Sequence, residues 1–132
     1  MAIDYGDVRI GIAISDLTRT IANGLENYVR IDLEKDVEHI IALAKENNVK
    51  VVVFGLPYNM DGTESNQTLK TKDFAKIIEE KSGLKVDFQD ERLTSLMAER
   101  MLINADVSRA KRKTVLDKLS ATIILEDYLK QI

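Results

Sequence analysis

Acidic side chains at three places in the sequence have the chemistry that a hydrolytic metal site needs. They are Asp4, the adjacent pair Asp90 and Glu91, and Asp117. Carboxylates brought within a few ångström of one another repel unless cations lie between them, and Mg²⁺ and Mn²⁺ prefer oxygen ligands. Two such ions, roughly 4 Å apart, stabilise the attacking and leaving oxygens of phosphoryl transfer. If the fold brings the acids together, the sequence predicts a Mg²⁺ or Mn²⁺ site.

Each acid also has a plain structural explanation. Asp4 comes shortly before Gly6-Asp7, and because Asp and Gly favour tight turns, Asp4 alone is better explained as a turn residue. Asp117 follows Lys113 by one helical turn, a spacing that gives a weak surface ion pair. Taken singly, the acids favour these explanations, whereas taken together they favour a metal site.

A basic segment, SRAKRK at 108–113, lies just before Asp117. Ser108 is an expected N-cap, so the cations fall in or next to a first helical turn, where the helix dipole favours anions instead. These cations are Arg109, Lys111, Arg112 and Lys113. A solvated helix end explains them, but so does a phosphodiester backbone bound beside the acids, and Arg9 would add another phosphate contact.

The loop at 57–66 is rich in small polar side chains and precedes a predicted helix. Its Thr63, Ser65 and Asn66 stand where backbone N–H groups at a helix N-terminus can bind an anion. An ordinary connecting loop with an Asp61-Gly62 turn explains the composition equally well.

Composition excludes several other classes of site. The chain has no cysteine and a single histidine, His39, which excludes thiol chemistry and Cys/His zinc sites. His39 falls off the apolar stripe of its predicted helix and is expected to be solvated. The net charge of −3 gives no overall attraction to nucleic acid, so such binding must rest on a local patch. No apolar run approaches the roughly 20 residues that span a bilayer, so we expect a cytoplasmic protein without a membrane segment.

Hydrophobic periodicity predicts the elements that position these residues. A chain of 132 residues fits one domain, 1–132. Residues 8–15 alternate between apolar and small or polar side chains, which predicts a strand paired in a hairpin with residues 1–5. Asp32 is an expected N-cap of the first helix. The remaining predicted elements are a strand near 26–31, a helix from 33 to the Asn47-Asn48 stop, a buried strand at 50–55, a helix at 67–81, a strand at 84–89 and helices at 95–104 and 108–129.

This order predicts a mixed α/β sheet with helices on both faces. Three strands in a row joined by short turns require antiparallel pairing, whereas the strand-helix-strand units that follow require parallel crossovers. Sites in such sheets gather at the carboxyl ends of the parallel strands. Here those ends carry Asp4, then residues 55–57, then Asp90 and Glu91.

Four segments in this order resemble the YqgF (RuvX) family, which carries the labels of pre-16S rRNA nuclease and Holliday junction resolvase-like protein. The segments are DYGDVRIGIAISD, GLPYNMDGTESN, DERLTS and SRAKRKTVLDKLSATIIL, and together they extend over essentially the whole chain. The resemblance implies an RNase H-like fold with the first strand central and a five-stranded sheet in the order 3-2-1-4-5. It also implies that Asp4, Glu91 and Asp117 are the catalytic, metal-binding acids.

Two details of the sequence differ from the family pattern. Strand periodicity places Asp90 with Val86 and Phe88 and assigns Glu91 to the other face, so Asp90 stays the alternative to Glu91 as the second acid. Family members usually carry a few more residues before the DYG motif, whereas Met1 here lies three positions before Asp4. The first strand is therefore expected to be short.

The resemblance implies a metal-dependent nuclease, a hydrolase that cuts phosphodiester bonds of RNA or branched DNA. One expected role is pre-16S rRNA processing in ribosome biogenesis, and the other is Holliday junction resolution in DNA recombination and repair. A monomer would favour RNA trimming, and a homodimer would favour a junction with two cleavage points. The competing hypotheses are a nucleic-acid-binding module with an idle metal site and half of an actin-like or sugar-kinase ATPase, a class that needs two such domains.

Overall fold

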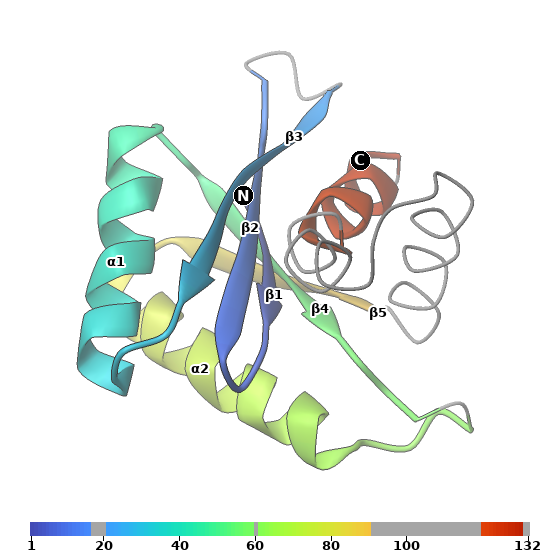
Figure 1. The fold of residues 1–132 in the computed structure, drawn as a ribbon. Helices are drawn as coiled ribbons and strands as arrows, with labels where there is room; N and C mark the ends of the chain where they lie inside the picture. The colour runs from blue at the N-terminus through green and yellow to red at the C-terminus, as the bar shows by residue number, and fades with distance from the viewer. Residues whose placement is uncertain (17–20, 60, 91–119, 131–132) are drawn as a thin grey trace, which may run out of the picture.

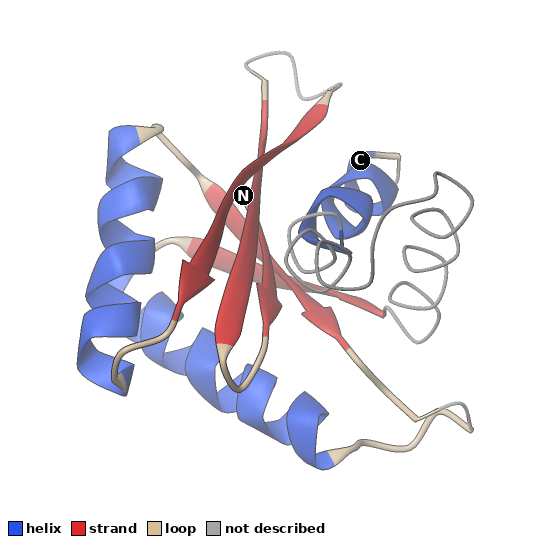
Figure 2. Cartoon of the chain, in the orientation of Figure 1, coloured by secondary structure: helices blue, strands red, loops and turns tan. Residues whose placement is uncertain are grey.

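A five-stranded sheet forms the centre of the protein (Figures 1 and 2). The structure is a computed structural model that describes residues 1–16, 21–59, 61–90 and 120–130. The strand order is β3-β2-β1-β4-β5; β1 pairs with β2 and β2 with β3 antiparallel, while β1 pairs with β4 and β4 with β5 in parallel. The strands are β1 (Ala2–Tyr5), β2 (Arg9–Ser15), β3 (Ala22–Val29), β4 (Val51–Leu56) and β5 (Lys85–Asp90). The predicted mixed sheet with order 3-2-1-4-5 is confirmed.

Helices cover both faces of this sheet, as predicted (Figure 1). Helices α1 (Leu33–Glu46) and α2 (Asn66–Ser82) lie together on one face, and the helical residues 120–129 lie on the other. The expected N-cap is present, because the Asp32 carboxylate accepts a hydrogen bond from the Lys35 N–H at 2.8 Å. None of the helices in the described ranges combines the length and the apolar composition that crossing a bilayer requires.

The two faces of the sheet bury side chains of different size. The face under α1 and α2, here called the α1/α2 face, carries Ile3, Tyr5, Ile10, Ile12, Val52 and Phe54. The opposite face, here called the 120–129 face, carries Ala2, Ala13 and Val53, which pack against Ala121, Ile124 and Leu125. Because successive strand residues point to opposite faces, this division fixes the side on which each site residue lies.

Strand β3 differs from its prediction: it begins at Ala22 and ends at Val29, not near 26–31. Its length follows that of β2, which pairs with it along all seven residues. The register shifts between Ile12 and Ala13, where Leu25 is an extra residue in β3. The predicted helix at 95–104 and residues 108–119 of the last predicted helix lie outside the described residues.

The prediction that His39 is solvated is wrong. Its Nε2 atom lies 3.1 Å from both carboxylate oxygens of Glu26, and its ring stacks on Tyr28 with the centroids 4.2 Å apart. The physical reason is that β3 lies alongside α1, which brings Glu26 and Tyr28 to the His39 ring. His39 is therefore a half-buried packing residue that joins α1 to β3.

Candidate active site

Asp4 lies in the central strand of the sheet, next to its carboxyl end. Strand alternation places its side chain on the 120–129 face, because Ala2, two residues earlier, packs there against the C-terminal helical residues. The residue is half-buried, while Ile3 and Tyr5 on either side of it point into the α1/α2 core. Asp4 is thus an acidic residue held on a rigid, well-packed strand.

Glycines flank Asp4 on both neighbouring strands. Asp4 pairs directly with Gly11 of β2, and because Ile3 pairs with Phe54 of β4, the next step of that register sets Gly55 beside it. Neither glycine has the left-handed backbone found at Gly62 and Gly83, so the conformation of the chain does not demand them. The positions that pair with Asp4 on the two neighbouring strands therefore carry no side chain, and glycine in a strand often marks close approach of a ligand or backbone.

The row continues outward with two amides. Gly11 pairs with Asn27 of β3, and Gly55 pairs with Gln89 of β5. We call this set the Asp4 row: Asn27, Gly11, Asp4, Gly55 and Gln89. The next row toward the amino ends of β1 and β4 is apolar at its centre and ends at Asp87, whose carboxylate accepts a 2.9 Å hydrogen bond from the Tyr128 hydroxyl. That bond fixes the C-terminal helical residues beside the Asp4 row.

Asp90 points away from Asp4. Val86 packs on the α1/α2 core, and the Phe88 ring lies 6.4 Å from that of Phe54, so the alternation of β5 places Asp90 on this same face. Glu91 and Asp117 lie outside the described residues, so the structure places only Asp4 among the three acids that the family resemblance implies. Within the described ranges, no three acidic or imidazole groups come together as a metal site.

Arg9 shares the face of Asp4. It precedes Gly11 by two residues in β2 and lies one step nearer the β1–β2 turn. Its side chain is partly exposed, and none of the ion pairs among the described residues uses it. The four cations of the basic segment, Arg109, Lys111, Arg112 and Lys113, lie outside the described residues.

The polar side chains of the loop at 57–66 form hydrogen bonds within the loop and with the start of α2. The Asp61 carboxylate accepts hydrogen bonds from both the N–H and the hydroxyl of Thr63, at 3.0 and 2.6 Å. Ser65 and Thr68 form a capping box that uses donors at the start of α2. These contacts favour the ordinary connecting loop over the anion site.

A cavity of about 350 Å³ opens at the opposite edge of the sheet, where β1, β4 and β5 begin. Lys50, Lys85 and Tyr128 are among the residues that line it, and no member of the Asp4 row does. The cavity is therefore separate from the candidate site.

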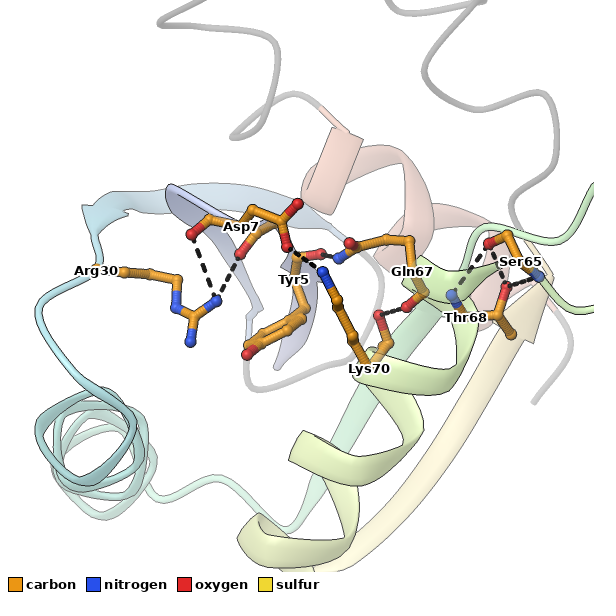
Figure 3. A network of polar contacts seen from close by, with 9 residues as sticks. Tyr5, Asp7, Arg30, Ser65, Gln67, Thr68 and Lys70 are labelled. Carbon is orange, nitrogen blue, oxygen red and sulfur yellow. Dashed lines mark hydrogen bonds and ion pairs between the residues drawn. The ribbon is translucent and has the colours of Figure 1, made fainter.

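Sequence reasoning missed the glycines beside Asp4 and the side chains that hold the turn after it. The position of a glycine inside a strand, as at Gly11, is a signal that sequence alone offers. Arg30 and Gln67 contact the residues that follow Asp4 from 24 and 62 positions away, and no local pattern marks them (Figure 3). Only the assembled fold identifies them.

Comparisons of the sequence with known proteins point to one family. The family model described as "RuvX: Holliday junction resolvase" matches residues 1–131. A protein of Clostridioides difficile named "Putative pre-16S rRNA nuclease" is 46% identical over 129 residues, covering 98% of this chain and 92% of its own. A protein of the same name from Thermoanaerobacter pseudethanolicus is 46% identical over 130 residues, covering 98% and 94%.

Solved structures of two resolvases have the same fold. RuvC of T. thermophilus, in complex with a Holliday junction substrate, superposes with a TM-score of 0.60 at 12% identity, covering 98% of this chain and 91% of its own. Fowlpox virus resolvase with Holliday junction DNA gives a TM-score of 0.57 at 14% identity, covering 98% and 95%. The predicted RNase H-like fold is confirmed. Given a family match that omits only the last residue, this chain belongs to the RuvX family.

Proposed function

We propose that this protein is a metal-dependent nuclease that hydrolyses phosphodiester bonds of RNA during maturation of the 16S rRNA precursor. The names of its relatives and its family support this reaction class. The observation that carries the proposal is the position of Asp4 on the central strand between Gly11 and Gly55. A turn residue does not need a glycine on each neighbouring strand, whereas a carboxylate that binds a metal ion and a phosphodiester benefits from the space that these glycines leave.

The proposed acids are Asp4, Glu91 and Asp117. The family resemblance supplies Glu91 and Asp117, and the alternation of β5 supports Glu91 over Asp90. Asp90 is on the α1/α2 face, opposite to the face of Asp4, which argues against Asp90 as the second acid.

This donor set fits a hard divalent cation. The proposed ligands are carboxylates, the chain has no cysteine, and its one histidine already lies against Glu26 on β3. Carboxylate oxygens suit Mg²⁺ or Mn²⁺ and give no reason to expect zinc. When bound, such an ion supplies a water of lowered pKa and neutralises charge on the leaving oxygen.

The chain itself would hold the substrate. Arg9, on the face of Asp4, would contact a backbone phosphate. The four cations of the basic segment would extend that contact along the bound nucleic acid: Arg109, Lys111, Arg112 and Lys113. These local cations are needed because the net charge of −3 gives no general attraction to nucleic acid. As a monomer trimming ribosomal RNA precursors, the protein would work in the cytoplasm.

Branched DNA is the second candidate substrate. The family description names a Holliday junction resolvase, and both resolvase structures share this fold. A homodimer would present two cleavage sites to a junction, and the protein would then act in recombination and repair.

The test is cleavage of two end-labelled substrates, a precursor-like single-stranded RNA and a four-way DNA junction, in Mg²⁺, Mn²⁺ or EDTA. We expect metal-dependent cutting of the RNA. Asp4→Asn, Glu91→Gln and Asp117→Asn should each lower the rate by roughly a hundredfold or more. Asp90→Asn is the matched control and should cut normally, because its side chain is on the other face.

Each outcome has a distinct meaning. Cutting of the junction alone would favour the resolvase, and loss of activity in Asp90→Asn with normal Glu91→Gln would reassign the second acid. Salt-sensitive binding without cutting in any metal, unchanged by Asp4→Asn, would contradict the catalytic proposal and leave a binding module.

A further inference from the structure

The β1–β2 turn begins two residues after Asp4, so its geometry sets where the end of β1 lies. The Gly6 N–H donates to the Arg9 carbonyl at 2.9 Å, and a Cβ on Gly6 would stand 2.6 Å from that same oxygen. The turn therefore admits no side chain at this position. The Arg30 N–H also donates to the Val8 carbonyl at 2.9 Å, which joins the turn to the end of β3.

Arg30 holds this turn through its side chain as well. Its Nη1 donates to the Gly6 carbonyl at 3.1 Å, and its guanidinium lies 4.6 Å from the centre of the Tyr5 ring (Figure 3). Its Nε donates to Asp36 at 2.8 Å, and Asp36 has no exposed surface. Because a fully buried carboxylate needs partners, Asp36 fixes the guanidinium in place.

Further hydrogen bonds secure Asp36. Its second oxygen accepts the Ile31 N–H at 2.9 Å. Burial alone would raise the pKa of Asp36, but the hydrogen bonds from Arg30, the Ile31 N–H and Tyr28 lower that pKa below its usual value. The carboxylate is therefore charged at neutral pH and keeps Arg30 directed at the turn.

Gln67 holds the other side of the same segment. It lies in the first turn of α2, and its side-chain nitrogen donates to the Tyr5 carbonyl at 2.5 Å (Figure 3). A backbone carbonyl can only accept, so the amide nitrogen must face it. The Ser65 cap fixes this end of α2, and the buried Thr71 hydroxyl donates to the Gln67 carbonyl at 2.8 Å. Lys70 adds an ion pair to Asp7 at 3.2 Å, but both side chains are largely exposed, so this contact is weak.

We propose that Arg30 and Gln67 are positioning residues that act through Tyr5 and Gly6 to hold the Asp4 carboxylate in its reactive place. This inference rests on the proposed function, in which Asp4 is a catalytic acid. The Tyr5 ring that Arg30 covers is in the core of the α1/α2 face, opposite to the face of Asp4. Arg30 and Gln67 therefore affect the reaction by fixing backbone, and a shift of about 1 Å at a reacting group can lower a rate on the order of a hundredfold.

A purely structural role makes a different prediction. If these side chains only stabilise the fold, their loss should matter no more than an equal loss of stability elsewhere. Gln67→Met keeps the side-chain length and removes the donor, and Arg30→Lys keeps the charge but loses the planar fork. Ser82→Ala is the matched control, because it removes two hydrogen bonds at the far end of α2, to the Ile78 carbonyl and from the Leu84 N–H.

The experiment measures kcat and KM for the cleaved substrate in Mn²⁺, together with amide hydrogen exchange at Gly6. We expect Gln67→Met and Arg30→Lys to lower kcat by roughly ten- to a hundredfold, with KM within about twofold of wild type and faster exchange at Gly6. Ser82→Ala should leave kcat and the Gly6 exchange rate unchanged.

Two results would overturn the inference while leaving the nuclease intact. One is normal kcat in Gln67→Met despite faster exchange, and the other is an equal fall of kcat in Ser82→Ala. If the wild type cuts neither substrate, the nuclease proposal is wrong, and this result says nothing about the positioning of Asp4. Amide hydrogen exchange at Tyr5 and Gly6 then decides the positioning: faster exchange in Gln67→Met that Ser82→Ala lacks supports it, and unchanged exchange overturns it.

Discussion

The two faces of the sheet differ in the size and polarity of the residues they present. On the α1/α2 face, large side chains such as Ile3, Ile12 and Phe54 meet two helices and are almost completely buried. On the 120–129 face, alanines and a valine occupy the row next to Asp4, and the Asp4 row itself consists of glycines, amides and one acid.

This difference separates stability from chemistry within a single strand. Close packing on the α1/α2 face supplies the apolar contacts that hold β1 rigid. On the 120–129 face, the positions of β2 and β4 directly beside Asp4 are glycines. Ile3 and Asp4 are adjacent in sequence, yet one serves the core and the other serves the candidate site.

The largest effect should come from breaking the α1/α2 face. Phe54→Ala removes a fully buried ring that lies 6.1 Å from that of Phe74, so we expect a loss of about 4 kcal/mol in the free energy of unfolding. Urea denaturation measures it. Leu69→Ala, on an exposed part of α2, is the comparison and should change stability by less than about 0.5 kcal/mol. Similar losses in the two variants would show that burial on this face does not govern stability.

The ion pair beside the α1/α2 core should give the next largest effect. Asp36→Asn leaves Arg30 without its carboxylate and should cost about 3 kcal/mol at pH 7. Because folding lowers the pKa of Asp36, its contribution is complete above the unfolded pKa of about 4 and is lost as the pH falls through the folded pKa. Unfolding curves of variant and wild type from pH 7 to 3 measure this.

In those curves the stability difference between Asp36→Asn and wild type should shrink in acid. Asp73→Asn, at an exposed position of α2, should match wild type throughout. A difference that stays constant across the whole pH range would contradict the assigned cause of the lowered pKa.

The 120–129 face should respond in activity instead of stability. Gly55→Ala adds one methyl group beside Asp4, and the backbone there tolerates a side chain. We expect cleavage to slow by roughly tenfold or more, while the loss in the free energy of unfolding stays below that of Phe54→Ala. Gly24→Ala in edge strand β3 is the matched control and should cut at the wild-type rate. Normal cleavage by Gly55→Ala would show that the glycines of the Asp4 row are not needed for the reaction.

The smallest effect should come from Arg9, at the outer part of the same face. Arg9→Gln removes one proposed phosphate contact, so binding should weaken by roughly three- to tenfold and the slope of log affinity against log salt should fall by about one. Fluorescence anisotropy with labelled RNA at several salt concentrations measures both. Arg9→Lys keeps the charge and should keep the slope. An unchanged slope in Arg9→Gln would show that Arg9 does not contact a backbone phosphate of the RNA.

Local signals in the sequence were sufficient for most of the framework. The alternation of residues 8–15, the N-cap at Asp32 and the unbroken apolar run of β4 each depend on neighbours within a few positions, and each matches the structure. The start of β3 was missed because its pairing with β2 extends it. His39 was misplaced because its contacts with Glu26 and Tyr28 join two elements that no local pattern brings together. Leu25, an extra residue in β3, also breaks the alternation on which strand predictions depend.

The sequence by itself determined which residues have the chemistry for the site and the order of the elements, because composition and hydrophobic periodicity are local properties. Only the tertiary structure decided that Gly11 and Gly55 flank Asp4, that Asp90 faces away from it, and that Arg30 and Gln67 hold the turn behind it. These relations join residues far apart in the chain. Strand order and register create them, and no local pattern encodes either.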